Sequence, residues 1–90
     1  MIELLTARQK QVLECIASGD SNQEIADQLY ISINTVRLHT STIMTALNVD
    51  NRNKCAKIWW QSQIDEIKDI LRRDTDLPED KIKNIFEVML

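Results

Sequence analysis

The side chains in this sequence that are best suited to chemistry are two cysteines and one histidine. Cys15 and Cys55 lie in stretches where apolar residues recur at helical spacing, and His39 is the only histidine. A structural zinc site needs about four such ligands at regular spacing, which this sequence does not offer. We therefore interpret both cysteines as reduced thiols of the protein core and predict that the protein binds no metal and no cofactor.

No group of residues in the sequence indicates catalysis. No nucleophile is recognisably paired with a base, and a single Gly cannot form a glycine-rich loop that would hold phosphates. The sequence shows no signal peptide, and no apolar run approaches the ~20 residues that cross a bilayer. We predict a soluble, cytoplasmic protein that is not an enzyme and that binds neither a membrane nor a small molecule.

Charge is distributed unevenly along the chain, whose formal net charge is −3. Residues 1–60 contain six basic and six acidic side chains, whereas residues 61–90 contain five basic and eight acidic ones. The first part of the chain is therefore neutral, and the second part is acidic. A neutral domain has little long-range attraction for a polyanion, so binding to nucleic acid would depend on local contacts.

The composition predicts an all-α fold, because one Gly and one Pro in 90 residues leave helices almost uninterrupted. Thr6 and Ser21 each begin a capping-box pattern, and Gly19 between them is suited to end the first helix. Ser32 is the expected cap of a longer helix over about 33–47. Helical spacing then predicts core positions at Val12, Leu13, Ile16, Ala17, Ile25, Ala26, Leu29, Val36, Ile43 and Leu47, with Thr40 or Met44 beside them.

A fourth helix is predicted to start near Asn51, with Asp50 as its cap. The apolar spacing of this helix continues to about Arg73, although a break near 61–63 is an alternative. After a turn, Pro78 is expected in the first turn of a last amphipathic helix. The apolar face of that helix contains Ile82, Ile85, Phe86 and Met89.

Two capped helices joined by a short turn describe a helix-turn-helix, and the residue types make the assignment specific. The residues in question are Leu5-Thr6-Ala7-Arg8-Gln9, Val12-Leu13, Ile16-Ala17, Gly19, Ser21-Asn22-Gln23-Glu24-Ile25-Ala26, Leu29, Ile31-Ser32, Asn34-Thr35-Val36-Arg37, His39, Ile43, Leu47, Val49 and Asn51-Arg52. This pattern closely resembles the LuxR-type (NarL/FixJ, GerE) DNA-binding domain over about residues 3–60. The resemblance implies a four-helix domain at 1–60. Residues 61–90 match nothing in the family's domain, and their charge and apolar spacing predict an acidic helical extension that packs on this domain or on a partner subunit.

The resemblance also implies which residues meet DNA, with residues 33–47 as the recognition helix. The positions that match base-reading residues of the family are Arg37, Leu38 and Ser41. Contacts to the DNA backbone fall on Gln23, Ser32, Asn34, Thr35 and His39. A solvated surface role for Arg37 and a structural role for His39 are the alternatives. The family usually has Lys where this chain has Gln23, and often a basic pair at Thr45 and Ala46, so a monomer should bind DNA weakly.

Apolar residues after the domain predict self-association or docking. Trp59 and Trp60 point about 100° apart in a helix, so we expect one in the core and the other against the extension or a partner. The residues predicted to make dimer or extension contacts are Trp59, Trp60, Ile64, Ile67, Phe86 and Met89. Packing within the monomer is the alternative.

The leading hypothesis is a stand-alone bacterial transcriptional regulator that binds double-stranded DNA as a homodimer on an inverted repeat. No receiver or ligand-binding domain is expected, because the motif follows Met1 directly. The alternative is a protein-interaction module, an anti-activator or adaptor, that uses the same fold to bind a partner regulator with weak or no DNA binding.

Overall fold

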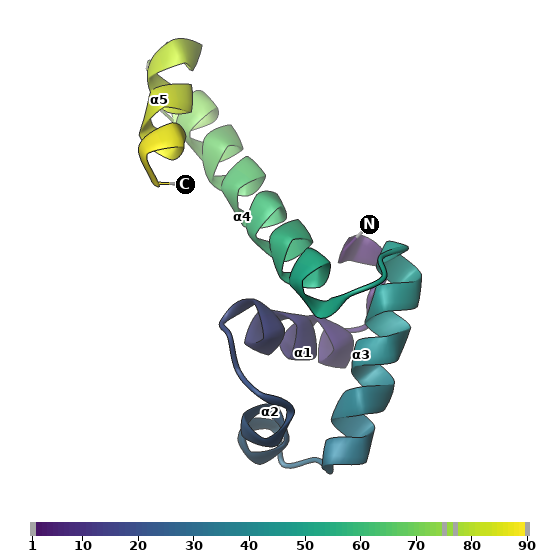
Figure 1. Cartoon of the computed structure of the whole chain (residues 1–90). Helices are drawn as coiled ribbons and strands as arrows, with labels where there is room; N and C mark the ends of the chain where they lie inside the picture. Colours follow the sequence, from purple (N-terminus) through teal and green to yellow (C-terminus); the bar gives the residue numbers. More distant parts are fainter. Residues whose placement is uncertain (1, 75, 77, 90) are drawn as a thin grey trace. The chain divides into compact units, whose positions relative to one another are not determined.

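The computed structural model describes residues 2–74, 76 and 78–89, apart from the side chains of residues 74, 86, 88 and 89. All regular structure in this range is helical, which confirms the predicted all-α fold (Figure 1). The elements are a 3-10 turn η1 (Ile2–Leu4), α1 (Ala7–Ala17), α2 (Asn22–Leu29), α3 (Ile33–Leu47), α4 (Arg52–Asp74) and α5 (Glu79–Met89). The chain divides into two compact units, residues 1–60 and 61–90, so α4 begins in the first and ends in the second.

Side-chain caps start the helices of the first unit. Thr6 and Ser21 each form the predicted capping box, in which the cap hydroxyl accepts from the backbone three residues on and that residue's side chain accepts from the cap amide. Ser32 caps α3, where its hydroxyl accepts from the Thr35 amide at 3.1 Å. These contacts satisfy backbone donors that have no partner within their own helix, which is why α1, α2 and α3 begin where the sequence predicted.

Three helices end on a residue in the left-handed region of backbone conformation. Gly19 follows α1 with φ 87°, Tyr30 follows α2 with φ 57°, and Asn48 follows α3 with φ 55°. In each case the next amide donates to the carbonyl five positions back, from Asp20 to Cys15, from Ile31 to Ala26 and from Val49 to Met44. Gly and Asn favour this conformation, whereas Tyr does not.

The core of the first unit lies between α1, α2, α3 and the start of α4. Its buried residues include every predicted position except Ala17 and Leu29, which are half-buried, and Thr40 rather than Met44 is the buried residue beside them. Leu5, before α1, and Cys55, in α4, complete this core. Burial of Cys55 fixes the first turns of α4 against the other helices of this unit.

α4 is one helix, with no break at residues 61–63. Its cap is Asn51, whose side-chain oxygen accepts from the Lys54 amide at 2.9 Å, so the prediction that Asp50 caps it is wrong. Asp50 instead accepts from the Lys54 ammonium group at 2.8 Å. Both residue types make good caps, and the pairing with Lys54 occupies the Asp50 side chain.

In the second unit, α5 turns back beside the last turns of α4 (Figure 1). The Arg72 guanidinium on α4 donates to the Glu79 carboxylate on α5, with a distance of 2.7 Å from Nε to Oε2. Ile82 is fully buried, while Ile85 on the same predicted face is 44% exposed. Pro78 directly precedes α5 and does not lie within its first turn. The side chains of Phe86 and Met89 fall outside the described residues.

Candidate nucleic-acid interface

Helices α2 and α3 form a helix-turn-helix joined by Tyr30, Ile31 and Ser32 (Figure 1). One side of α3 packs in the core through Val36, Thr40, Ile43 and Leu47. The opposite side is exposed, because residues one or two positions further along point away from the core. Polar or exposed side chains on that side include Asn34, Arg37, Leu38, Ser41, Thr42 and Thr45.

The residues expected to read bases, Arg37, Leu38 and Ser41, all lie exposed within the first nine residues of α3. Nη1 of Arg37 donates to Oδ1 of Asn34 at 3.2 Å, which orients both side chains across one turn of the helix. Leu38 is 66% exposed, although an apolar side chain of this size gains most when it is buried. The structure therefore brings a guanidinium, an apolar side chain and a hydroxyl onto one accessible surface.

The residues expected to meet the DNA backbone are less uniform. Ser32 and Asn34 are exposed at the start of α3, whereas Thr35 and His39 are half-buried. Thr35 and Ser32 share a hydrogen bond between their hydroxyls at 2.9 Å. Gln23 lies on α2, and its amide donates to the Asp27 carboxylate at 2.9 Å. The second hydrogen of this amide group remains available to a phosphate oxygen.

Comparison with known proteins identifies the family. Residues 3–58 match the model of the luxR family of bacterial regulatory proteins, which is more than half of the chain. The chain belongs to the luxR family. This confirms the resemblance, and the prediction that the protein is not an enzyme is confirmed with it, because the family consists of transcription regulators.

Among curated proteins, relatives of this luxR-family chain include three described as response regulator protein VraR. They come from Staphylococcus aureus (strain Mu3 / ATCC 700698), Staphylococcus saprophyticus and Staphylococcus epidermidis. Each is 44% identical to this chain over 54 residues, which cover 60% of this chain and 26% of the relative. The match thus spans about a quarter of the length of these relatives.

The luxR-family domain has little positive charge on its recognition helix. Arg37 is the only formally charged residue of α3. Arg52 does not add to this surface, because its guanidinium donates to the Asn22 side chain and to the Asp20 carbonyl, each at 2.6 Å. These bonds tie the start of α4 to the start of α2. The sequence signal for Arg52 was its match to the start of the family's last helix, which did not indicate its partners.

The residues expected to make dimer or extension contacts divide between the two units. Trp59 is half-buried and packs against the core of the first unit, whereas Trp60 is half exposed. The Trp60 indole donates to the Ala17 carbonyl at the end of α1, at 3.0 Å. In the second unit, Ile64 is half-buried and Ile67 is 47% exposed.

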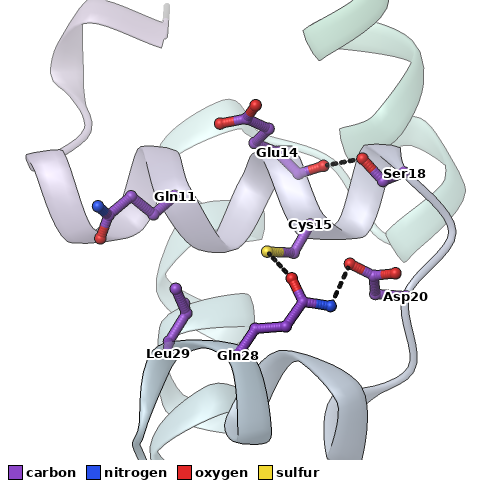
Figure 2. A pocket seen from close by; sticks show the side chains of 7 residues that line it. All are labelled: Gln11, Glu14, Cys15, Ser18, Asp20, Gln28 and Leu29. Atoms are coloured by element: carbon purple, nitrogen blue, oxygen red, sulfur yellow. Dashed lines mark hydrogen bonds between the residues drawn. The ribbon is translucent and has the colours of Figure 1, made fainter.

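Figure 2 shows a polar hollow of about 340 Å³ between α1 and α2 in this luxR-family domain. The Cys15 thiol donates to the Gln28 side chain at 3.7 Å, and the Gln28 amide donates to Asp20 at 3.1 Å. Burial, together with the negative charges of Asp20 and Glu14, raises the pKa of the Cys15 thiol. A thiol with a raised pKa is a poor nucleophile, so this network links two helices and does not form a reactive site.

Burial also raises the pKa of Cys55, whose side chain is fully enclosed in the core. Both cysteines are free thiols, but only Cys55 lies in the core as predicted, whereas Cys15 is half-buried at its edge. Among the residues that the structure describes, no helix is long and apolar enough to cross a membrane.

Proposed function

We propose that this chain is a bacterial, cytoplasmic regulator of transcription that binds double-stranded DNA through α2 and α3. The observation that carries the proposal is the exposed group Arg37, Leu38 and Ser41 on the recognition helix of a luxR-family domain. An α-helix fits the major groove, where each base pair presents a distinct set of donors, acceptors and methyl groups.

The chemistry of these side chains suits direct readout of bases. The Arg37 guanidinium can donate two hydrogen bonds to O6 and N7 of a guanine, and Leu38 can pack on a thymine methyl group. Ser41, one turn further along, can donate to or accept from a base edge. Ser32, Asn34, Thr35, His39 and Gln23 then set the register on the phosphates, which carries no sequence information by itself.

Two copies are proposed to act together on an inverted repeat. One recognition helix with one arginine makes few charge-assisted contacts, so a single domain has low affinity. A two-fold dimer places a second recognition helix in the next major groove and reads two half-sites. Exposed isoleucines of the second unit, Ile67 and Ile70, offer apolar area for self-association.

DNA binding is tested by fluorescence anisotropy with a mixed pool of duplexes at about 50 mM and about 200 mM salt. We expect salt-sensitive binding, with Arg37→Ala weakening it by roughly tenfold or more. Arg8→Ala is the matched control, since it removes the same charge from the exposed first turn of α1 and should change affinity less than about twofold. Absence of wild-type binding at low salt would overturn the proposal and favour a protein-interaction module.

Self-association is tested by sedimentation of the full chain and of an Ile67→Ser, Ile70→Ser double variant. The wild type should sediment as a dimer. The variant should already be monomeric at protein concentrations at which the wild type is still a dimer, and its helical content should be unchanged. A monomeric wild type at all concentrations, with or without DNA, contradicts the homodimer.

A further inference from the structure

Tyr30 occupies a position where the fold gives it no stabilising role. It ends α2 in the left-handed conformation, with φ 57° and ψ 45°. The two other helix ends in that conformation have Gly19 and Asn48, the residue types that adopt it at least cost. A bulky residue at positive φ is strained, because its Cβ approaches the following carbonyl oxygen.

Packing does not compensate for this strain. Tyr30 is 94% exposed, so its ring gains almost nothing from burial. Within the part of the chain that the structure describes, no hydrogen bond involves its hydroxyl. The backbone around it is held by the bond from the Ile31 amide to the Ala26 carbonyl, which any residue at position 30 would permit. The Tyr30 amide itself donates to the Ala26 carbonyl, but its side chain stabilises nothing in the free protein, which is a reason to examine the place of that side chain in binding.

That place is the turn of the helix-turn-helix. Only Ile31 separates Tyr30 from Ser32, the cap of α3, and Asn34 and Thr35 follow in the first turn. Fully extended, two residues span at most about 7 Å, so the Tyr30 backbone stays next to the start of the recognition helix. The phosphates that such a turn approaches accept hydrogen bonds from hydroxyl donors as well as from cations.

We propose that the Tyr30 hydroxyl donates a hydrogen bond to a DNA phosphate beside the start of α3. This inference rests on the proposed DNA binding and adds a neutral anchor to a helix that has one cation. A hydroxyl bonded to an anionic oxygen makes a strong, charge-assisted hydrogen bond. Because Tyr30 carries no charge, it adds affinity without adding to the counterions that binding releases.

The test compares Tyr30→Phe with the wild type by DNA titration across a range of salt concentrations. Phe keeps the ring and the backbone conformation and removes only the hydroxyl. We expect affinity to fall roughly tenfold on every duplex, with an unchanged slope of log affinity against log salt. A lost cationic contact would instead lower that slope by about 0.9.

Tyr30→Gly provides an independent check, since it relieves the strain and also removes the hydroxyl. We expect its thermal midpoint Tm to rise by about 5 °C while its DNA affinity falls at least as far as that of Tyr30→Phe. Stability and binding would then change in opposite directions, as expected for a side chain that contributes to binding and not to folding, and Tyr30→Phe shows whether the hydroxyl itself is responsible.

Two results would overturn the phosphate contact while leaving the proposed function intact. One is wild-type DNA binding that Tyr30→Phe leaves unchanged, and the other is a salt slope that Tyr30→Phe lowers. Absence of wild-type binding at low salt would overturn both proposals together.

Discussion

Arg52 and Asn22 lie 30 residues apart in the chain, and the Arg52 guanidinium donates to the Asn22 side-chain oxygen at 2.6 Å. The same guanidinium donates to the Asp20 carbonyl just before α2, at 2.6 Å. One side chain at the start of α4 thus holds the segment that leads into the helix-turn-helix.

Substitution of Arg52 is expected to destabilise the domain. Arg52→Ala leaves the Asp20 carbonyl and the Asn22 amide oxygen without their donor, which should lower the free energy of unfolding by about 2 kcal/mol. Urea unfolding followed by circular dichroism measures this. Lys57→Ala, an exposed cation on the same helix, should stay within about 0.5 kcal/mol of the wild type. Equal effects of the two substitutions would mean that the Arg52 bonds contribute nothing specific.

Serine substitution is expected to distinguish the two cysteines. Cys55→Ser places a hydroxyl in a fully apolar core site and should cost about 1–3 kcal/mol of unfolding free energy. Cys15→Ser should be nearly neutral, because the new hydroxyl can donate to the Gln28 side chain that now accepts from the thiol. Thermal unfolding of both variants measures the difference. A larger cost at Cys15 would contradict the burial of these two sites.

Leu38 provides a test of base contact that does not depend on charge. On a duplex selected from the mixed pool, we expect replacement of one thymine by deoxyuridine, which lacks the methyl group, to weaken wild-type binding. Leu38→Ala should bind both duplexes equally, because the partner of that methyl group is gone. Measuring all four affinities gives the coupling between side chain and methyl. Zero coupling at every thymine would remove Leu38 from the interface.

The hairpin of α4 and α5 should weaken in acid. Hydrogen bonds from Arg72 lower the pKa of the Glu79 carboxyl below its ordinary value. The pKa of a Glu carboxyl in an unfolded chain is about 4.3. A carboxyl whose pKa is lower than this in the folded protein stabilises the fold at pH values above the unfolded pKa, and this stabilisation is lost as the pH falls through the folded pKa. Arg72→Gln should therefore raise the pKa of Glu79, as measured by NMR titration.

Arg73→Gln is the matched control for the acid-dependence of this hairpin. The neighbouring Arg73 donates to the Asp69 carbonyl instead of to Glu79. Its substitution should leave the Glu79 titration unchanged. A shift as large as that of Arg72→Gln would mean that general charge, and not the hydrogen bond, sets the pKa.

Local features of this fold were predictable from sequence, and long-range ones were not. The starts of α1 and α2 followed from Thr6 and Ser21 because both partners of a capping box lie within four residues. The placement of Arg37 on an accessible surface was implied by the resemblance, and its side chain is exposed in the structure. The prediction that Asp50 caps α4 was wrong. Which of the neighbouring residues Asp50 and Asn51 acts as the cap depends on where the Lys54 side chain lies.

Partners distant in the chain could not be inferred from residue type or periodicity. Trp59 and Trp60 were expected to divide between the core and the extension or a partner, but the bond from the Trp60 indole to the Ala17 carbonyl, 43 residues away, was not predicted. No role was predicted for Tyr30, because the sequence does not show that a residue other than Gly or Asn adopts a left-handed conformation. The candidate surface was thus foreseen from the resemblance, but its internal hydrogen bonds were not.

The local caps described for the first unit also bear on how fast it folds. Helix starts that are set within four residues form early, and contacts close in sequence need little loop closure. Helical domains dominated by such contacts fold in microseconds to milliseconds. The Arg52–Asn22 bond, by contrast, forms only when segments 30 residues apart have met. Newly synthesised copies of this domain would thus fold almost as soon as they are made. The rate of synthesis, rather than the rate of folding, would then limit how quickly folded copies accumulate.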